Sequence, residues 1–262
     1  MILRGNFSSE ILHMSTNIQV FIPDNCKKPF RVVYLLHGLH GDQGTWLDNT
    51  MLAYFARKYN AVFVMPEVGR SFYLNLKYGR KYYDYVSEEL PRMCRGIFNI
   101  SADREDTAVM GCSMGGFGAL MLAFTRPDQF GFCGAISPAC LYFKPMLEGL
   151  RTNPEPYLRT GSEAEEVYKD MHCAYGGGLE YRKDCDIVEL AKSFPSGMPK
   201  PKIYVTCGTE DNLRKENLSF RDEMKNLDFD FTYEEWTGCH DWYFFNDSLK
   251  KTLEVWFKNE NS

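Results

Sequence analysis

Residues 107–120 read TAVMGCSMGGFGAL, an apolar run, a cluster of glycines around Ser113 and a second apolar run. Residues 111–115 meet the pattern G-x-S-x-G, which arises often by chance. When a strand enters and a helix leaves, however, the serine stands on a strained turn with its Oγ exposed at the top of a sheet. Glycines at 111 and 115 clear space where a Cβ would collide with neighbouring backbone. We therefore predict a strand at 106–111, a helix at 114–126 and a nucleophilic Ser113; the alternative is a glycine-rich structural bend.

Apolar runs and helical patterns alternate along the rest of the chain. The runs predict further strands at 15–23, 30–38, 60–68, 132–139 and 202–208, with an edge strand at 230–236. The first of these alternates like an antiparallel strand, whereas the later runs are continuously apolar, as in strands buried on both faces. Helical patterns fall at about 49–58, 81–97 and 213–226, and a last one follows residue 240. This order predicts an α/β fold, a doubly wound, mostly parallel sheet with helices on both faces.

The length of 262 residues suits one such domain, spanning 1–262. The polar stretch 141–200 interrupts the alternation, contains Gly176, Gly177 and Gly178 in a row and shows only short helical pieces. It is long for a simple connection, so we interpret it as an insert on the rim of the sheet and a partial lid. A solvated insert without contact to substrate is the alternative.

Composition narrows the class of protein. The formal net charge of −5 argues against nucleic-acid binding, which needs a basic face. Neither a signal peptide nor a run of 18 apolar residues is present, so we expect no membrane partner. The nine cysteines are an odd number without a CxxC pair. This use of cysteine is typical of a reducing compartment and predicts a cytoplasmic protein. The sequence does not decide the oligomeric state, and a homo-oligomer stays open.

A serine nucleophile needs a histidine base and an acid that orients the base, and on this fold they follow in the order serine, acid, histidine. Of the two histidines after Ser113, His172 lies in the polar insert, whereas His240 follows a strand and opens the last helix. Asp211 ends the strand at 202–208 and is the predicted acid. Glu210 is the alternative acid, and Asp211 could instead cap the next helix.

Acyl transfer also needs two N–H donors for the oxyanion. The first is expected from the backbone of Met114, at the start of a helix, and the second from Leu39, in the loop HGLHGDQGTW at 37–46. We expect His37 to orient this loop rather than to transfer protons in catalysis. We expect no metal and no cofactor, because the histidines of this loop lack ligands at metal spacing on a second element.

Two further hypotheses concern the residues around the site, its substrate-lining side chains and its cysteines. Ser71, Tyr73 and Tyr78 follow the strand at 60–68 and are candidates for lining the mouth of the site; plain surface packing is the alternative. Cys112, Cys207 and Cys239 each lie beside a predicted site residue or its strand. Oxidation of Cys207 or Cys239 is therefore a hypothetical route to lower activity, against the simpler reading of small apolar filler.

These motifs resemble the esterase D-like group of α/β-hydrolases over roughly residues 10–258. The resemblance lies in YLLHGLHGDQGTWL, GCSMGGFGALMLAF, CGTEDNL and GCHDWYFF. It is nearest to small tributyrin-type esterases and more distant from S-formylglutathione hydrolases and from feruloyl and acetyl-xylan esterases. It implies Ser113, Asp211 and His240 as a catalytic triad, with Leu39 and Met114 forming the oxyanion hole.

The expected function is a serine carboxylesterase acting on a small-molecule ester with a short acyl or hydroxycinnamoyl group, such as an acylated sugar. Two alternatives use the same triad, an acyltransferase and a thioesterase of the S-formylglutathione type. S-Formylglutathione hydrolases have a serine and a tyrosine after the histidine, where this chain has Asp241 and Trp242. A binding protein that kept the fold without catalysis would lack a triad member, and none is missing here.

Overall fold

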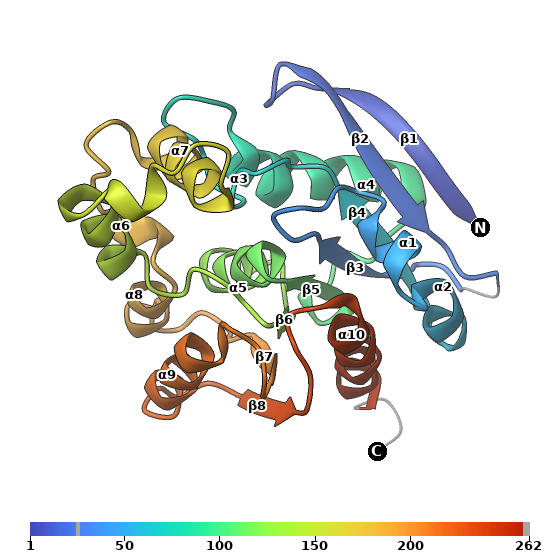
Figure 1. Cartoon of the computed structure of the whole chain (residues 1–262). Helices are drawn as coiled ribbons and strands as arrows, with labels where there is room; N and C mark the ends of the chain where they lie inside the picture. The colour runs from blue at the N-terminus through green and yellow to red at the C-terminus, as the bar shows by residue number, and fades with distance from the viewer. Residues whose placement is uncertain (25–26, 259–262) are drawn as a thin grey trace.

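The computed structural model describes residues 1–24 and 27–258 and shows one eight-stranded sheet between two layers of helices (Figure 1). The strand order is β1-β2-β4-β3-β5-β6-β7-β8. The strands are β1 Ile2–Ser9, β2 Met14–Phe21, β3 Arg31–Leu36, β4 Ala61–Pro66, β5 Thr107–Cys112, β6 Phe132–Ile136, β7 Lys202–Gly208 and β8 Phe231–Trp236. From β4 to β8 all neighbours are parallel, whereas β1 and β2 form an antiparallel hairpin on β4. The doubly wound, mostly parallel sheet is therefore confirmed.

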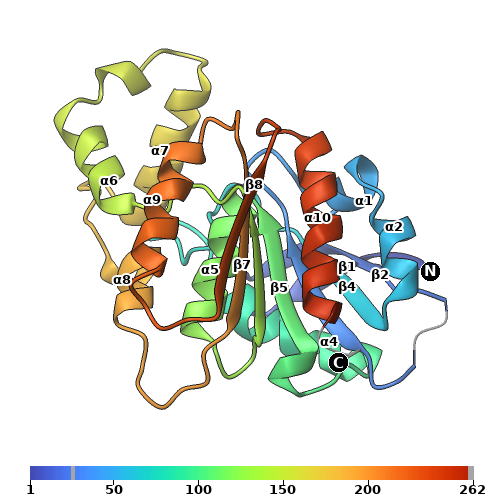
Figure 2. The same ribbon diagram turned by 90° about the horizontal axis from the view of Figure 1, so that it is seen from below.

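The two faces of the sheet are covered by different helices. The helices are α1 Thr45–Asn49, α2 Leu52–Phe55, α3 Tyr82–Asp84, α4 Leu90–Phe98, α5 Met114–Thr125, α6 Phe143–Thr152, α7 Glu163–Tyr175, α8 Ile187–Lys192, α9 Arg214–Met224 and α10 Trp242–Phe257. Alternate residues of β3 point to opposite layers. Tyr34 belongs to a core cluster that includes residues of α4, α5 and α9, whereas Val33 and Leu35 belong to a second cluster with residues of α1, α2 and α10. Figure 2 shows α10, α1 and α2 together on one side and α5, α8 and α9 on the other.

Three sequence expectations differ from the observed elements. The strand β1 was not expected, because most of its residues are exposed and it carries no buried apolar stripe. The helix expected at 49–58 is divided into α1, α2 and a short 3-10 turn, Ala56–Lys58. The helix expected at 81–97 is continuous from α3 through a π-helical turn, Tyr85–Glu89, into α4. Pro91 has no N–H for the carbonyl of Ser87 four residues earlier, which instead accepts hydrogen bonds from the side chains of Arg126 and Gln129.

The segment 141–200 is more helical than the sequence suggested. It contains α6, α7 and α8, and α7 alone has 13 residues. Figure 2 shows α6 and α7 at the end of the sheet where α10 begins. This is the carboxyl end of the parallel strands, where open α/β sheets bind their ligands. Over the described residues, no helix combines the length and apolarity that a membrane span requires.

Candidate active site

Ser113 occupies a strained turn between β5 and α5. Its backbone has φ 55° and ψ −119°, a region that residues other than glycine rarely adopt. Its N–H donates to the carbonyl of Ile136 at 2.9 Å, and its own carbonyl accepts from the N–H groups of Phe117 and Ala139, both at 3.1 Å. Hydrogen bonds from both neighbouring elements thus hold the strained turn in place. They fix the serine at the carboxyl end of the central strand β5.

Two glycines make this turn sterically possible, as the sequence predicted. A Cβ on Gly111 would lie 2.4 Å from the carbonyl oxygen of Gly115, and a Cβ on Gly115 would lie 2.3 Å from the carbonyl oxygen of Leu36. Both obstacles are backbone atoms, which cannot rotate away as a side chain would. The loop after β3 therefore passes directly against the first turn of α5.

Substitution Gly115→Ala is expected to lower the free energy of unfolding by about 3 kcal/mol or more, because β3 and α5 must separate to admit the methyl group. Urea unfolding followed by circular dichroism measures the effect. The matched control is Gly96→Ala in α4, where no atom lies within 4 Å of the added Cβ and alanine favours the helix. Equal unfolding midpoints for Gly115→Ala and the parent would contradict this account of the turn.

His240 and Asp211, predicted from separate loops, are brought together by the structure. His240 Nδ1 lies 2.8 Å from Asp211 Oδ2, and the imidazole is 26% exposed while the carboxylate is fully buried. Asp211 Oδ1 accepts the N–H of Leu213 at 2.7 Å in the turn before α9, whereas the N-cap residue of α9 is Leu213 and no side chain caps the helix. The alternative role of Asp211 as the cap of this helix is therefore wrong. Burial opposes ionisation of Asp211, but the hydrogen bonds from His240 and Leu213 outweigh it and lower the pKa of the carboxyl.

The alternative residues point elsewhere. The carboxylate of Glu210 lies 3.6 Å from the thiol of Cys239, its hydrogen-bond donor. The imidazole of His172, in α7, bonds the carbonyl of Tyr168 one turn earlier through Nδ1. Asp241, next to His240, caps α10 by accepting the N–H of Phe244 at 3.0 Å. Of these acids, Asp211 alone is bonded to His240 in the described hydrogen bonds.

The predicted oxyanion donors lie on either side of Ser113. Met114 is the first residue of α5, where a backbone N–H has no partner within the helix. Leu39 follows Gly38, whose added Cβ would stand 3.5 Å from the Cβ of Ser113. No hydrogen bond in the described part of the chain uses the N–H of Leu39 or Met114. Both groups are thus available to a ligand beside the serine.

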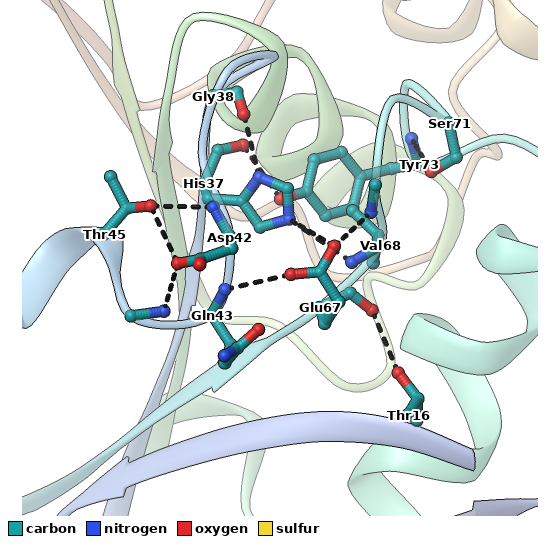
Figure 3. Close-up of polar contacts among 12 residues, drawn as sticks. Thr16, His37, Gly38, Asp42, Gln43, Thr45, Glu67, Val68, Ser71 and Tyr73 are labelled. Carbon is teal, nitrogen blue, oxygen red and sulfur yellow. Dashed lines mark hydrogen bonds and ion pairs between the residues drawn. The ribbon is translucent and has the colours of Figure 1, made fainter.

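A polar network supports the loop that carries Leu39 (Figure 3). His37 Nδ1 lies 2.8 Å from the carbonyl oxygen of Gly38, and Nε2 accepts the N–H of Val68 at 3.3 Å. This pattern requires a neutral ring protonated at Nδ1, and burial accordingly lowers the pKa of His37. The carboxylate of Glu67 accepts the N–H of Gln43 at 3.2 Å. As expected, His37 orients the loop; Glu67 was missed, although it follows the buried strand β4 just as Asp211 follows β7.

Ser113 and His240 open into the same small pocket, whose volume is about 170 Å³. The loop after β3 provides Leu39, His40 and neighbouring residues, and α10 provides Trp242 and Phe245. The ring of Phe245 meets the imidazole of His240 edge to face, with centroids 5.0 Å apart. Over residues 1–24 and 27–258, no cluster of three or more His, Cys, Asp or Glu side chains is arranged to hold a metal ion.

The suggested substrate-lining residues are placed differently from the expectation. Ser71 and Tyr73 are each 1% exposed, so they offer no surface to a ligand. Left-handed backbone at Phe72 and Tyr73 turns the tyrosine inward, and its hydroxyl donates to the carbonyl of His37 at 2.9 Å (Figure 3). Tyr78 is exposed but does not contribute to the pocket that contains Ser113. Tyr73 is therefore a structural support of the loop before Leu39.

The three cysteines near the site differ in accessibility. Burial raises the pKa of both Cys112 and Cys207 to about 12, so their reactive thiolate forms are scarce. Cys239 is exposed, but desolvation and the neighbouring Glu210 carboxylate raise its pKa as well. These directions favour the simpler reading of the cysteines as packing residues over a redox role.

Several known proteins are similar to this chain in both sequence and fold. The family model "Putative esterase" matches residues 9–254. An acetyl esterase of Caldicellulosiruptor saccharolyticus is 30% identical over 265 residues, covering 97% of each chain. Two Staphylococcus aureus structures, a fluorophosphonate-binding serine hydrolase and an S-formylglutathione hydrolase, are each 26% identical with a TM-score of 0.81 and cover 98% of both chains. The chain therefore belongs to the putative esterase family, has the α/β-hydrolase fold and is a carboxylic ester hydrolase.

Proposed function

We propose that Ser113, His240 and Asp211 act as a catalytic triad for ester hydrolysis. His240 takes the proton of Ser113 Oγ as the oxygen attacks the ester carbonyl, and Asp211 stabilises the imidazolium that forms. The protonated His240 then gives this proton to the departing alcohol, which leaves an acyl-enzyme on Ser113. Water, deprotonated by His240, then attacks the acyl-enzyme; as the bond between the acyl carbon and Ser113 Oγ breaks, His240 returns the proton to Oγ and the acid is released. The observation that carries the proposal is the strained Ser113 in one pocket with a His240 that Asp211 orients at 2.8 Å.

The backbone N–H groups of Leu39 and Met114 are the proposed oxyanion hole. Both lie beside Ser113, and neither donates elsewhere in the described hydrogen bonds. The dipole of α5 adds favourable potential at Met114, because negative charge is stabilised at a helix N-terminus. The network around His37 and Glu67 would hold the Leu39 donor in position before substrate arrives.

A short acyl group, acetyl in size, is the proposed acid portion of the substrate. The pocket around Ser113 has about 170 Å³, well under the roughly 300–1,000 Å³ of sites for drug-sized ligands. The similarity to an acetyl esterase supports the same choice. A hydroxycinnamoyl group, the other acyl group considered from the sequence, fits this volume less well.

Hydrolysis of 4-nitrophenyl esters from acetate to octanoate, with methyl ferulate alongside, tests the acyl preference. We expect kcat/KM to fall by about tenfold or more between butyrate and octanoate, because the longer chain finds no enclosed apolar surface. Methyl ferulate is expected to be a poorer substrate than methyl acetate. A flat profile across the series would refute the short-acyl assignment and leave the triad intact.

A thioesterase acting on S-formylglutathione is the second candidate. It is supported by the 26% identity with the S-formylglutathione hydrolase of Staphylococcus aureus. The formyl group would fit the small pocket as well as acetyl does. The decision therefore depends on the leaving group, and S-formylglutathione belongs in the same kinetic comparison.

We also propose that the segment 141–200 forms part of the rim of the site within a single domain. Glu163, the first residue of α7, pairs with His40 of the pocket loop at 2.9 Å and with Arg70 at 3.1 Å. Arg70 in turn pairs with Asp170 at 2.8 Å. These exposed pairs contribute little stability each, but they tie α7 to the loop that carries Leu39.

A reducing, cytoplasmic location is proposed from the cysteines. The eight that the structure describes are free thiols, and five of them are buried: Cys94, Cys112, Cys133, Cys185 and Cys207. Buried free cysteines act as small apolar residues and are common where thiols stay reduced.

A further inference from the structure

A second and larger cavity lies beside the pocket of Ser113. We call it the α10 groove; residues 48–51, from the last turn of α1 to the residue before α2, line one side, and Trp242, Tyr243, Asn246 and Asp247 line the other. Its volume is about 640 Å³, several times that of the nucleophile pocket. Asn246 Oδ1 accepts the N–H of Met51 at 2.8 Å, which joins the two walls. Figure 2 shows α10 and the α1–α2 segment on the same side of the sheet.

The α10 groove and the nucleophile pocket share a wall. Trp242 lines both cavities, and it is fixed by edge-to-face contacts with Trp46 and Phe245, each with centroids 5.4 Å apart. Trp242 lies two residues after His240, which lines the smaller pocket. The two cavities are therefore adjacent across the Trp242 side chain.

The groove is lined by aromatic side chains and by hydrogen-bonding groups, a combination that suits a ring carrying several hydroxyl groups. Tyr243 is 88% exposed, an unusual position for a large aromatic side chain that no other element covers. It lies one helical turn before Asp247, while Trp242 lies one turn before Asn246, so aromatic rings and hydrogen-bonding groups share one side of α10. A sugar ring can pack its C–H face on the tyrosine while amide and carboxylate oxygens accept its hydroxyl protons.

Charge excludes an acidic occupant. The groove carries the carboxylates of Asp48 and Asp247, and no lysine or arginine is among its lining residues. Arg4 approaches from β1, but it pairs with Asp48 at 3.8 Å and does not line the groove. A leaving group with its own carboxylates, such as glutathione, would be repelled, whereas a neutral sugar would not.

We propose that the α10 groove binds the alcohol portion of the substrate, and that this portion is a neutral sugar. The proposal rests on the proposed esterase function of Ser113 and adds the class of leaving group. Three acetyl donors that differ only in the leaving group test it: methyl 6-O-acetyl-β-glucoside, 4-nitrophenyl acetate and S-acetylglutathione. The variants are Tyr243→Ala, the double variant Asp48→Asn, Asp247→Asn, and, as a matched control, Tyr54→Ala.

The expected readout is the ratio of kcat/KM for the acetylglucoside to kcat/KM for 4-nitrophenyl acetate. Tyr243→Ala should lower this ratio about tenfold through KM, because the nitrophenyl ester does not need the whole groove. Tyr54 is 67% exposed on α2 outside the groove, so Tyr54→Ala should leave the ratio unchanged. The double aspartate variant should raise kcat/KM for S-acetylglutathione several-fold, because it removes two negative charges.

Two results would overturn the proposal. One is a ratio that Tyr243→Ala leaves unchanged, whether both activities fall together or neither changes. The other is a double aspartate variant whose kcat/KM for S-acetylglutathione equals that of the parent. Titration of free cellobiose into the parent protein, followed by NMR chemical shifts, separates the groove from the esterase reaction: binding that Tyr243→Ala abolishes supports the groove even if ester hydrolysis fails, and absence of binding contradicts it.

Discussion

Substitution Ser113→Ala is expected to reduce kcat for 4-nitrophenyl acetate by at least about 10⁵-fold, as loss of the serine does in a protease with this type of triad. Without Oγ no acyl-enzyme can form, and hydrolysis is left to the oxyanion donors and to bound water. The backbone hydrogen bonds that hold residue 113 do not involve the hydroxyl, so the fold should be retained. Initial rates, corrected for spontaneous hydrolysis, and intact-protein mass after mixing with substrate provide the measurement.

The control for this substitution is Ser219→Ala. Ser219 is an exposed serine of α9 whose hydroxyl donates to the carbonyl of Lys215 one turn earlier. Its removal should leave kcat and the acylated mass species unchanged. If Ser113→Ala retained the rate of the parent, or if acyl groups still accumulated on the variant, Ser113 would not be the nucleophile.

Substitution Asp211→Asn should lower kcat by about 10⁴-fold with a much smaller change in KM, the size of effect measured for the equivalent change in a serine protease. The amide cannot stabilise the imidazolium of His240 and allows the wrong tautomer of the ring. Glu210→Gln is the matched control, because it neutralises the adjacent carboxylate, whose described partner is the thiol of Cys239. Equal losses for the two variants would remove the reason for assigning Asp211.

The Asp211→Asn variant also reports on the stability of the protein in acid. The pKa of Asp211 is lowered in the folded protein, so its ionised form stabilises the fold above the unfolded-state pKa of about 3.9. This contribution is lost as the pH falls through the lowered pKa. The free energy of unfolding of Asp211→Asn should therefore depend less steeply on pH below about pH 4 than that of the parent.

The sheet and the central residues of the site could be predicted because the sequence carries strong local signals for them. The inner parallel strands are largely apolar and buried, and Ser113 and Asp211 follow two of them, whereas His240 follows the half-buried edge strand β8. Since parallel strands end at the same edge of the sheet, residues distant in sequence must converge there. The 2.8 Å contact between His240 and Asp211 follows from this rule.

Other features depend on tertiary contacts that leave little trace in the sequence. β1 is a mostly exposed edge strand without an apolar pattern of its own. It forms because its backbone pairs with the neighbouring strand β2. Tyr73 was predicted to line the site, with surface packing as the alternative, but a left-handed backbone turns its ring against α5, where a Cβ on Gly118 would lie 2.6 Å from it. No periodicity predicts such a turn, because it depends on the space that Gly118 leaves.

The start of α7, in contrast, is marked by a local sequence signal for a helix N-terminus that the prediction of this segment did not include. Ser162 Oγ accepts the N–H of Glu165 at 3.2 Å, and the carboxylate of Glu165 accepts the N–H of Gly161 at 2.6 Å. The spacing of serine and glutamate is that of a capping box, which marks the beginning of a helix. Applied to the segment 141–200, it would have predicted the longest helix there.

The strand order has a consequence for how the enzyme matures. Leu39, Ser113, Asp211 and His240 follow β3, β5, β7 and β8, so the site closes only when the final strand has docked at the edge of the sheet. Contacts between such distant parts of a chain form slowly, after local helices and hairpins. During refolding, esterase activity should thus recover last, later than the circular dichroism signal of the helices. The recovery of activity would therefore report when the fold is complete.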